Sequence, residues 1–293
     1  MTTTGAALVI GATGLLGRSV SEYLRTLGHR VVETSRRQTP GDVPLDILAD
    51  AGSWKPPVGI TTAYFCAAVT SQRECRQSFA RAYAVNVTAT VLLVRRLIDA
   101  GIFVVFPSTN LVFDGSQPHV LADTIPNPRT AYGRMKAEAE TQLLAIGGVG
   151  IVRLTKVVHD RLPIFAEWRA ALTHGIAVHP FDDMVFSPLS VRDAVSVLVA
   201  TGHNRLNGLI QASAQDDISY AKACRLFVQR LHVAESLVKP VSWRRFVDRP
   251  EHAPEHTTLD TTRAQDCCGF IPTSAHAAVE DVVAAATVVQ HDM

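Results

Sequence analysis

The amino-terminal stretch contains the feature that most restricts the fold, an apolar run that passes directly into a glycine-rich turn. The run Ala6-Ala7-Leu8-Val9-Ile10 is followed by Gly11-Ala12-Thr13-Gly14-Leu15-Leu16-Gly17, and a helical pattern begins there. A strand that ends in glycines and opens a helix is the arrangement with which parallel α/β proteins hold the pyrophosphate of a dinucleotide. The turn therefore predicts a strand–helix–strand unit and a dinucleotide site.

Each glycine of the turn has its own expected role. Gly11 permits the tight turn, Gly14 lets backbone approach the pyrophosphate, and Gly17 lets the helix pack closely on the sheet. Free N–H groups and the helix dipole favour an anion at this position. We expect Thr13, Leu15 and Leu16 to border the cofactor as well. A glycine-bearing turn without a ligand is the alternative. The chain has no G-x-x-x-x-G-K motif, so a loop that binds a nucleoside triphosphate is not supported.

A second group of residues has the chemistry of proton transfer. Ser108 and Thr109 end the apolar run 103–106, and Tyr132 and Lys136 follow at a spacing that places both on one face of a helix. A nearby ammonium lowers the pKa of a tyrosine hydroxyl, and a hydroxyl at a strand end can bind the reacting oxygen. Tyr-x-x-x-Lys alone also fits an ordinary surface helix, but a proline-rich loop and a capping Thr130 precede it.

Apolar runs alternate with helical patterns along the chain. Strands are expected at 7–10, 30–34, 62–66, 103–106 and 150–154, and helices at 15–27, 80–100 and 131–146. This alternation predicts an α/β fold of the Rossmann type, with a doubly wound parallel sheet. We expect a dinucleotide-binding domain over residues 1–160, a returning strand–helix unit near 187–202, and a smaller, mainly substrate-binding part over 161–293.

Composition excludes several other classes of protein. The net charge of +1 gives no attraction to nucleic acid or to a membrane surface, and no apolar stretch approaches the length of a membrane span. The 5 cysteines form no C-x-x-C and favour reduced thiols in a cytoplasmic protein. The motif His252-Ala253-Pro254-Glu255-His256 matches a zinc-peptidase pattern, but Pro254 interrupts the helix such a site needs, so no metal is expected.

The chain resembles the extended short-chain dehydrogenase/reductases, and within them the dTDP-4-dehydrorhamnose reductase-like branch. The segments that carry the resemblance lie at 11–17, 66–70, 82–87, 108–115, 128–136, 151–155, 187–194 and 258–261. The resemblance implies that Thr109, Tyr132 and Lys136 are the catalytic trio, with Tyr132 as proton donor and Lys136 also on the nicotinamide ribose. It further implies cofactor contacts from Cys66, Ala67, Ala68 and Asn86, and a homodimer through helices 80–100 and 131–146.

The resemblance implies an NADP-dependent reductase of a keto group, best fitted to the 4-keto group of a nucleotide-linked deoxysugar. A sugar-nucleotide epimerase or dehydratase is one alternative, although the acidic pair of a dehydratase is absent at Asn110-Leu111. A non-catalytic NADP-binding regulatory subunit is the other, and the intact trio argues against it.

NADPH rather than NADH is expected from the end of the second strand. Ser35, Arg36 and Arg37 stand where an acidic residue would bind the ribose of NAD, and a hydroxyl with two cations suits a 2′-phosphate. Glu33 is the competing residue, which would favour NAD. Asp46 and Ile47 should lie at the adenine, with a helix cap as the alternative role of Asp46.

The substrate should lie at the carboxyl ends of the strands. Thr70, Ser108 and Asn110 are the expected substrate contacts, with Leu111 beside them. The segment 181–186 should line the pocket too, or could equally be a loop packed on the lid. The branch usually carries Asp-Tyr where this chain has Asn110-Leu111. That exchange removes a charge and a hydroxyl, and predicts a less polar or differently oriented sugar.

Overall fold

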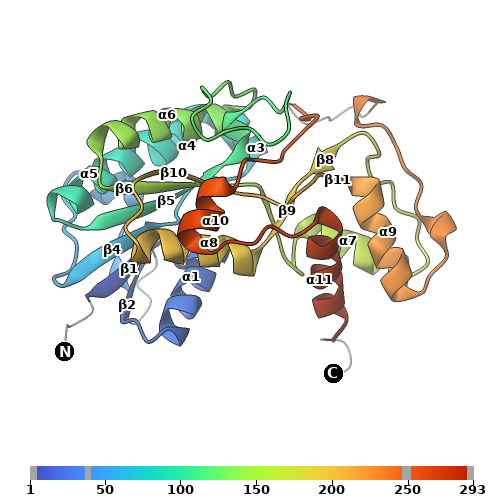
Figure 1. The fold of residues 1–293 in the computed structure, drawn as a ribbon, viewed down its shortest axis with the longest axis horizontal. Coiled ribbons are helices and arrows are strands. Elements are labelled where there is room, and N and C mark those ends of the chain that lie inside the picture. The colour runs from blue at the N-terminus through green and yellow to red at the C-terminus, as the bar shows by residue number, and fades with distance from the viewer. Residues whose placement is uncertain (1–4, 37–40, 246–251, 289–293) are drawn as a thin grey trace.

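One parallel sheet organises the molecule. The computed structural model describes residues 5–36, 41–245 and 252–288. Seven strands form the sheet in the order β10-β6-β5-β4-β1-β2-β3, and every neighbouring pair is parallel (Figure 1). The strands are β1 Ala6–Ile10, β2 Val31–Ser35, β3 Val43–Pro44, β4 Ile60–Phe65, β5 Phe103–Thr109, β6 Val149–Leu154 and β10 Gly208–Ala212. This is the Rossmann-type α/β fold that the sequence predicts.

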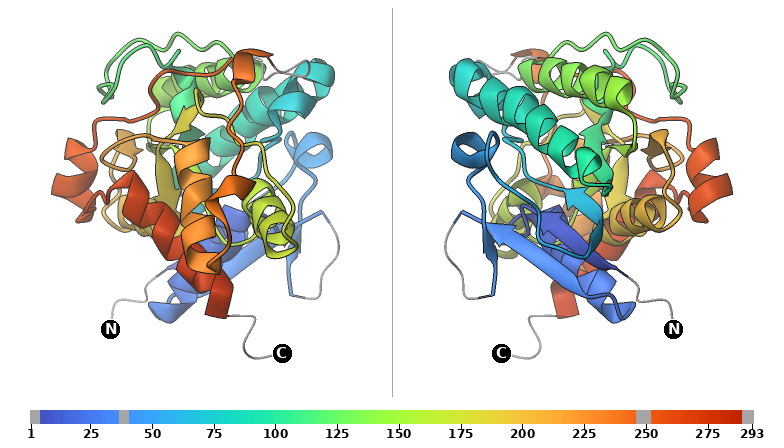
Figure 2. Two further views of the ribbon diagram at one scale, coloured as in Figure 1. Left: turned by 90° about the vertical axis from the view of Figure 1, so that its right-hand side faces the viewer. Right: turned by 90° about the vertical axis from the view of Figure 1, so that its left-hand side faces the viewer.

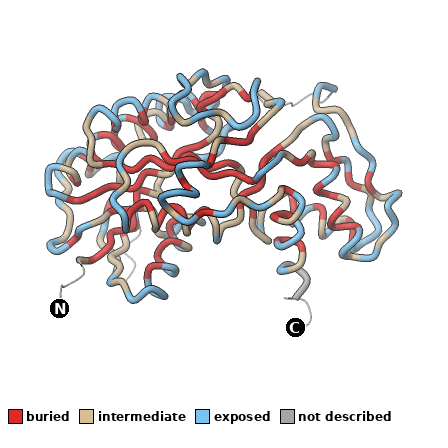
Figure 3. Tube along the Cα trace, viewed as in Figure 1, coloured by how far each residue is buried: buried red, intermediate tan, exposed pale blue. Residues whose placement is uncertain are grey.

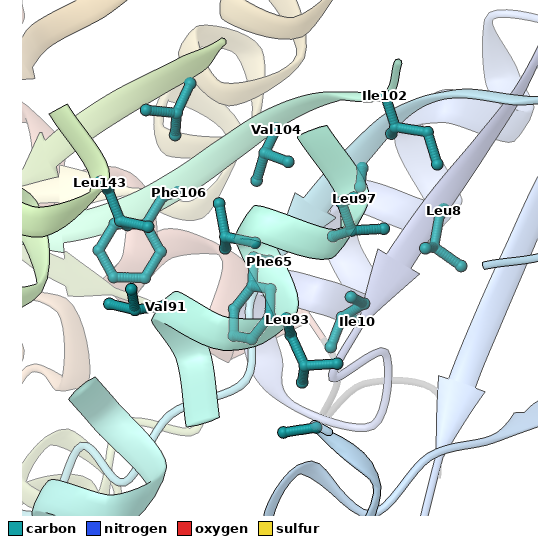
Figure 4. Close-up of a cluster of buried hydrophobic side chains, with 14 of the residues drawn as sticks. Leu8, Ile10, Phe65, Val91, Leu93, Leu97, Ile102, Val104, Phe106 and Leu143 are labelled. Carbon is teal, nitrogen blue, oxygen red and sulfur yellow. The ribbon is translucent and has the colours of Figure 1, made fainter. Parts of the chain in front are cut away.

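Both faces of the sheet are buried under helices. On β1, Leu8 and Ile10 point to one face and pack on α5, whereas Ala7 and Val9 point to the other face, which α1 and α8 cover (Figures 1 and 4). Because successive side chains of a strand alternate in direction, a run that is apolar throughout requires cover on both sides. The helices of these layers are α1 Leu15–Thr26, α2 Ile47–Asp50, α3 Gln72–Gln77, α4 Phe79–Tyr83, α5 Thr90–Asp99, α6 Ala131–Ile146, α8 Val191–His203 and α10 Thr262–Cys268.

A separate hydrophobic core lies in the carboxyl-terminal part. Phe165, Trp168 and Phe227 form its centre, with ring centroids 5.2 Å to 5.9 Å apart. Figure 2 shows this part beside the sheet, and in Figure 3 a line of buried residues runs through it. Its elements are α7 Pro163–Thr173, α9 Tyr220–Leu231, α11 Ala275–Val288, the strand pairs β7 Lys156–Val158 with β9 Pro188–Ser190 and β8 Val185–Phe186 with β11 Ile218–Ser219, and the 3-10 turns η3 Glu235–Leu237 and η4 Trp243–Arg245.

Two expected elements differ from the structure. The helix expected at 80–100 is divided into α4, the π-helical segment η1 Ala84–Ala89 and α5. The returning unit near 187–202 supplies the helix α8, but its strand β9 pairs with β7 outside the main sheet. The strand that returns to the sheet is β10, which pairs with β6. The sequence did not reveal β10 because Gly208 and Gln211 interrupt its apolar run.

Candidate active site

The carboxyl ends of β1 and β4 meet at the glycine turn. The Cys66 N–H donates to the Ile10 carbonyl at 2.8 Å, which sets the residues after β4 beside the turn. Gly11 has a φ of +84°, and a Cβ on it would lie 2.7 Å from the Ala67 nitrogen. Only glycine fits this approach, so the turn and the 66–68 segment form one wall of the site.

The amino end of α1 is open to a ligand. Gly14 occupies the N-cap position and contributes no side-chain hydrogen bond to the first turn, while Thr13 and Leu15 are exposed. Gly17 is buried, and Leu16 packs on the core beneath α1. Uncapped N–H groups at a helix start attract an anion, and the geometry fits the predicted pyrophosphate position.

The second strand ends where the sequence predicts. β2 ends at Ser35, which is buried, and Arg36 follows on the surface. Arg37 lies outside the described residues. Glu33 is held by Arg25 of α1 at 2.8 Å. Burial raises the pKa of Glu33, but the hydrogen bond and charge of Arg25, with a contribution from Ser21, together outweigh burial, so the pKa is lowered and the carboxylate has a partner within the fold.

Asp46 has the alternative role that the sequence left open. Its carboxylate caps α2 by accepting from the Leu48 and Ala49 N–H groups, the first at 2.9 Å. Ile47 is half-buried against the core. The adenine contact of both residues stays a prediction.

A close contact joins the strand of Thr109 to the helix of Tyr132. Thr130 caps α6 by accepting from the Gly133 N–H at 3.0 Å, as predicted. A Cβ on Gly133 would stand 2.1 Å from the Leu111 carbonyl oxygen, in the 3-10 turn η2 Asn110–Val112 that follows β5. The Thr109 hydroxyl accepts from the Leu111 N–H at 3.2 Å. The missing side chain of Gly133 therefore lets α6 begin directly beside the end of β5.

Tyr132 and Lys136 lie in different surroundings. Tyr132 packs with Val69 and the buried Cys75, and burial raises the pKa of its hydroxyl, with a smaller effect of the Cys75 thiol. The Lys136 ammonium donates to the Pro107 carbonyl at 2.7 Å and lies 3.5 Å from the centre of the Phe106 ring. Burial lowers the pKa of Lys136 to about 7, against the opposing influence of Glu140. Burial likewise raises the pKa of the nearby Cys66 thiol to about 12.

Asn86 controls the loop after β4. Its side-chain oxygen accepts from the Val69 N–H at 2.8 Å and its NH₂ donates to the Val69 carbonyl at 2.9 Å. The residue sits in the π-helical segment η1, and such segments often mark functional positions. Asn86 thus fixes the 66–70 loop, in which Ala67 and Ala68 are half-buried and Thr70 is exposed.

Ser108 points away from Thr109, as strand alternation requires, and donates to the buried Glu140. The hydroxyl proton of Ser108 is thus bound by Glu140, and the substrate contact expected of Ser108 stays a prediction. Sequence reasoning also passed over Glu140 and its partner Arg153, although a charged residue inside the apolar run of β6 was a usable signal.

A shallow hollow lies beyond Thr109. Asn110, Leu111 and Thr130 line it together with Arg129, His256 and Thr258. The 181–186 segment packs elsewhere: Asp183 accepts from the Trp243 N–H at 2.8 Å, and Phe181 packs on the core of the carboxyl-terminal part. The segment includes strand β8 and packs on the carboxyl-terminal part, and its place at the substrate pocket stays a prediction.

The histidine motif forms no metal centre in the described chain. Residues 252–256 are not helical, and no group of three metal-ligating side chains occurs within residues 5–36, 41–245 and 252–288. Across the same ranges, every helix is too short or too polar to cross a membrane.

The fold and the glycine turn define a Rossmann-type α/β protein with a site at the carboxyl edge of its sheet. Residues 6–288 match the RmlD substrate binding domain, and the chain belongs to this family. The match spans both the sheet and the carboxyl-terminal part, and it confirms the resemblance drawn from the motifs.

Two kinds of protein occur among its relatives. A dTDP-4-keto-6-deoxy-D-glucose reductase of Streptomyces niveus is 27% identical over 86% of this chain and 87% of its own length. The methionine adenosyltransferase 2 subunit beta of Xenopus tropicalis is 26% identical over 80% of this chain and 75% of its own length.

Solved structures share the fold. A dTDP-4-dehydrorhamnose reductase of Clostridium acetobutylicum superposes with a TM-score of 0.84 at 22% identity, covering 97% of this chain and 99% of that one. A reductase of the same name from Bacillus anthracis, solved with NADP, gives 0.81 at 20% identity, covering 96% and 99%. MoeE5 in complex with UDP-glucose and NAD gives 0.81 at 23% identity, covering 97% and 100%.

Proposed function

We propose that this chain is an NADPH-dependent reductase of a keto group, and that its substrate is a 4-keto, nucleotide-linked deoxysugar. The observation that carries the proposal is the close contact between Gly133 and Leu111, which sets the helix of Tyr132 and Lys136 beside the end of β5, where Thr109 lies. Membership of the RmlD family and the similarity to the Streptomyces niveus reductase support it.

The residues at the carboxyl edge fit a nicotinamide dinucleotide. The uncapped start of α1 would take the pyrophosphate at Gly14, and the exposed Arg36 would take a 2′-phosphate. Glu33 does not compete, because Arg25 holds its carboxylate. When bound, the nicotinamide would supply a hydride to the carbonyl carbon.

The chain's own residues would protonate the carbonyl oxygen and stabilise its charge. Tyr132 gives it a proton, and the Thr109 hydroxyl donates a hydrogen bond that shares the developing charge. The burial that raises the pKa of Tyr132 opposes formation of its phenolate, so the tyrosine needs a cation nearby. Lys136, one helical turn further along α6, would provide that cation, and its ammonium donates to the Pro107 carbonyl.

The substrate class is tested by loss of NADPH absorbance with a panel of 4-keto sugar nucleotides. Because Asn110 and Leu111 replace Asp and Tyr, we expect weak activity on dTDP-4-dehydrorhamnose and better activity on a more deoxygenated sugar. The double variant Asn110→Asp/Leu111→Tyr should shift the preference back. If dTDP-4-dehydrorhamnose is the best wild-type substrate, the reading of these two positions is wrong and the reductase proposal stands.

A regulatory subunit that holds NADP without turnover is the second candidate. The similarity to methionine adenosyltransferase 2 subunit beta favours it, and the Lys136 ammonium already has a partner in the Pro107 carbonyl. The same panel separates the candidates: if the protein binds NADPH but oxidises none of it with any substrate, the regulatory function replaces the reductase.

A homodimer through α5 and α6 is proposed as well. Phe79, Leu92 and Leu144 are exposed apolar side chains on α4, α5 and α6. Sedimentation of the wild type against Leu92→Glu would test it, since a charge in an apolar interface would dissociate the dimer.

A further inference from the structure

A buried ion pair lies directly behind the proposed catalytic residues. Arg153 of β6 is 1% exposed and Glu140 of α6 is 2% exposed, and the guanidinium contacts the carboxylate at 2.8 Å and 3.1 Å. Glu140 follows Lys136 by one helical turn, and it also accepts a hydrogen bond from Ser108, the neighbour of Thr109. The carboxylate therefore joins the strand of Thr109 to the helix of Tyr132 and Lys136.

The same guanidinium reaches the segments that border the hollow. It donates to the Ala122 carbonyl at 2.9 Å and to the Gln211 side chain at 3.2 Å. The Gln211 amide in turn donates to the carbonyls of Val120 and Asp260, at 2.8 Å and 3.1 Å. Val120 and Leu259, which precedes Asp260, both line the hollow beyond Thr109.

Stability alone is a weak explanation for this network. A buried ion pair commonly adds little net stability over apolar residues of the same volume, because desolvation offsets the attraction. An arginine fork, in contrast, fixes the relative placement of several acceptors. The acceptors here are Glu140 on α6, the Gln211 side chain on β10, and the Ala122 carbonyl in the loop beside the hollow.

We propose that Arg153 and Glu140 are positioning residues of the active site, which hold the Thr109 strand, the Tyr132–Lys136 helix and the 120–122 loop in register. The proposal rests on the proposed reductase function. Neither residue contacts the reacting atoms; each acts through the backbone or side chains it holds.

Glu140 also contributes a negative charge to the surroundings of Lys136. The groups that face this ammonium are Glu140 from its own helix, Cys66 from the end of β4, and the Pro107 carbonyl with the Phe106 ring from β5. Glu140 favours the charged form of Lys136, so its loss lowers the pKa of the lysine further. Activity that needs the ammonium should then fall at a lower pH.

The test is the double variant Glu140→Met/Arg153→Met, which removes the network without leaving a buried charge unpaired. For the folded variant we expect kcat at least about 10-fold lower, NADPH affinity within about 3-fold of wild type, and an alkaline limb of the kcat–pH profile at lower pH. Unchanged kcat and pH profile would overturn the proposal. Ser108→Ala is the second variant, because it breaks only the tie between β5 and Glu140. Thr201→Val is its matched control, since this buried hydroxyl bonds within α8 on the other face of the sheet.

The outcomes separate the two proposals. If the double variant does not fold, the kcat of Ser108→Ala tests the positioning role. A kcat of Ser108→Ala equal to that of Thr201→Val overturns it. If the wild type itself turns over no keto sugar, the reductase function fails, and hydrogen exchange of residues 108–113 and 120–122 is compared instead. Exchange in the variant equal to wild type would then refute the positioning role without any activity measurement.

Discussion

The glycine turn allows a sharp test, because two of its glycines should fail in different ways when a methyl group is added. A Cβ on Gly17 would stand 2.2 Å from the Gly11 carbonyl oxygen, and ordinary contact begins near 3.4 Å, so the turn must open by about 1.2 Å. The neighbouring atoms are all backbone and cannot rotate away. A Cβ on Gly14 would meet only the same oxygen at 3.5 Å, which is ordinary contact.

We therefore expect Gly17→Ala to lose about 1–3 kcal/mol of unfolding free energy, the usual range for an overpacked site. Gly14→Ala should lose at most about 1 kcal/mol, because alanine is a poorer N-cap than glycine. For the NADPH affinity of the folded protein, we expect the opposite order: Gly14→Ala should be the more damaging change. The Gly14 methyl would stand where backbone approaches the pyrophosphate, and should raise the NADPH Kd at least about 10-fold, a loss of ~1.4 kcal/mol.

Guanidinium unfolding gives the stabilities, and NADPH fluorescence titration gives the affinities. Wild-type stability of Gly17→Ala would show that the backbone clash is relieved in a way the structure does not account for. Wild-type NADPH affinity of folded Gly14→Ala would show that the pyrophosphate does not lie over the start of α1.

Three further predictions concern the chemistry. Tyr132→Phe should lower kcat at least ~100-fold, the scale of a lost general acid, with NADPH affinity little changed by titration; turnover near wild type would remove Tyr132 from the mechanism. The kcat/KM should be higher with NADPH than with NADH. Arg36→Ala should reduce this difference in kcat/KM, while the control Arg225→Ala, on α9, should leave it unchanged. Equal or better use of NADH by the wild type would point to Glu33 as the ribose ligand instead. Burial lowers the pKa of Lys136 from its ordinary 10.5 to about 7, so between these values the unfolded chain binds one proton more than the folded protein, and stability falls as pH drops through that window. Unfolding free energy measured from pH 10 to pH 7 should thus fall by up to about 4 kcal/mol more in the wild type than in Lys136→Met, at 1.36 kcal/mol per pH unit, and parallel curves would contradict this.

Local pattern was enough to predict the central elements. The glycine turn placed α1 within one residue of its observed end, and Thr130 with the helical spacing after it gave the full extent of α6. The continuous apolar runs predicted strands covered on both faces, which the two hydrophobic layers on β1 confirm. These features follow from the chain within a few residues, so the sequence carries them.

Contacts between distant segments decided the remainder. Alternation along β5 turns Ser108 to Glu140, and only the packing of α6 on β5 and β6 reveals that Ser108, Glu140 and Arg153 meet. Likewise β10 becomes a strand because β6 offers its free edge, not because of its own pattern. The sequence by itself determined a Rossmann-type sheet with a glycine turn and the spacing of Tyr132 and Lys136. The tertiary structure alone decided which polar groups are hydrogen-bonded within the protein, because the partner of a buried group comes from an element far away along the chain.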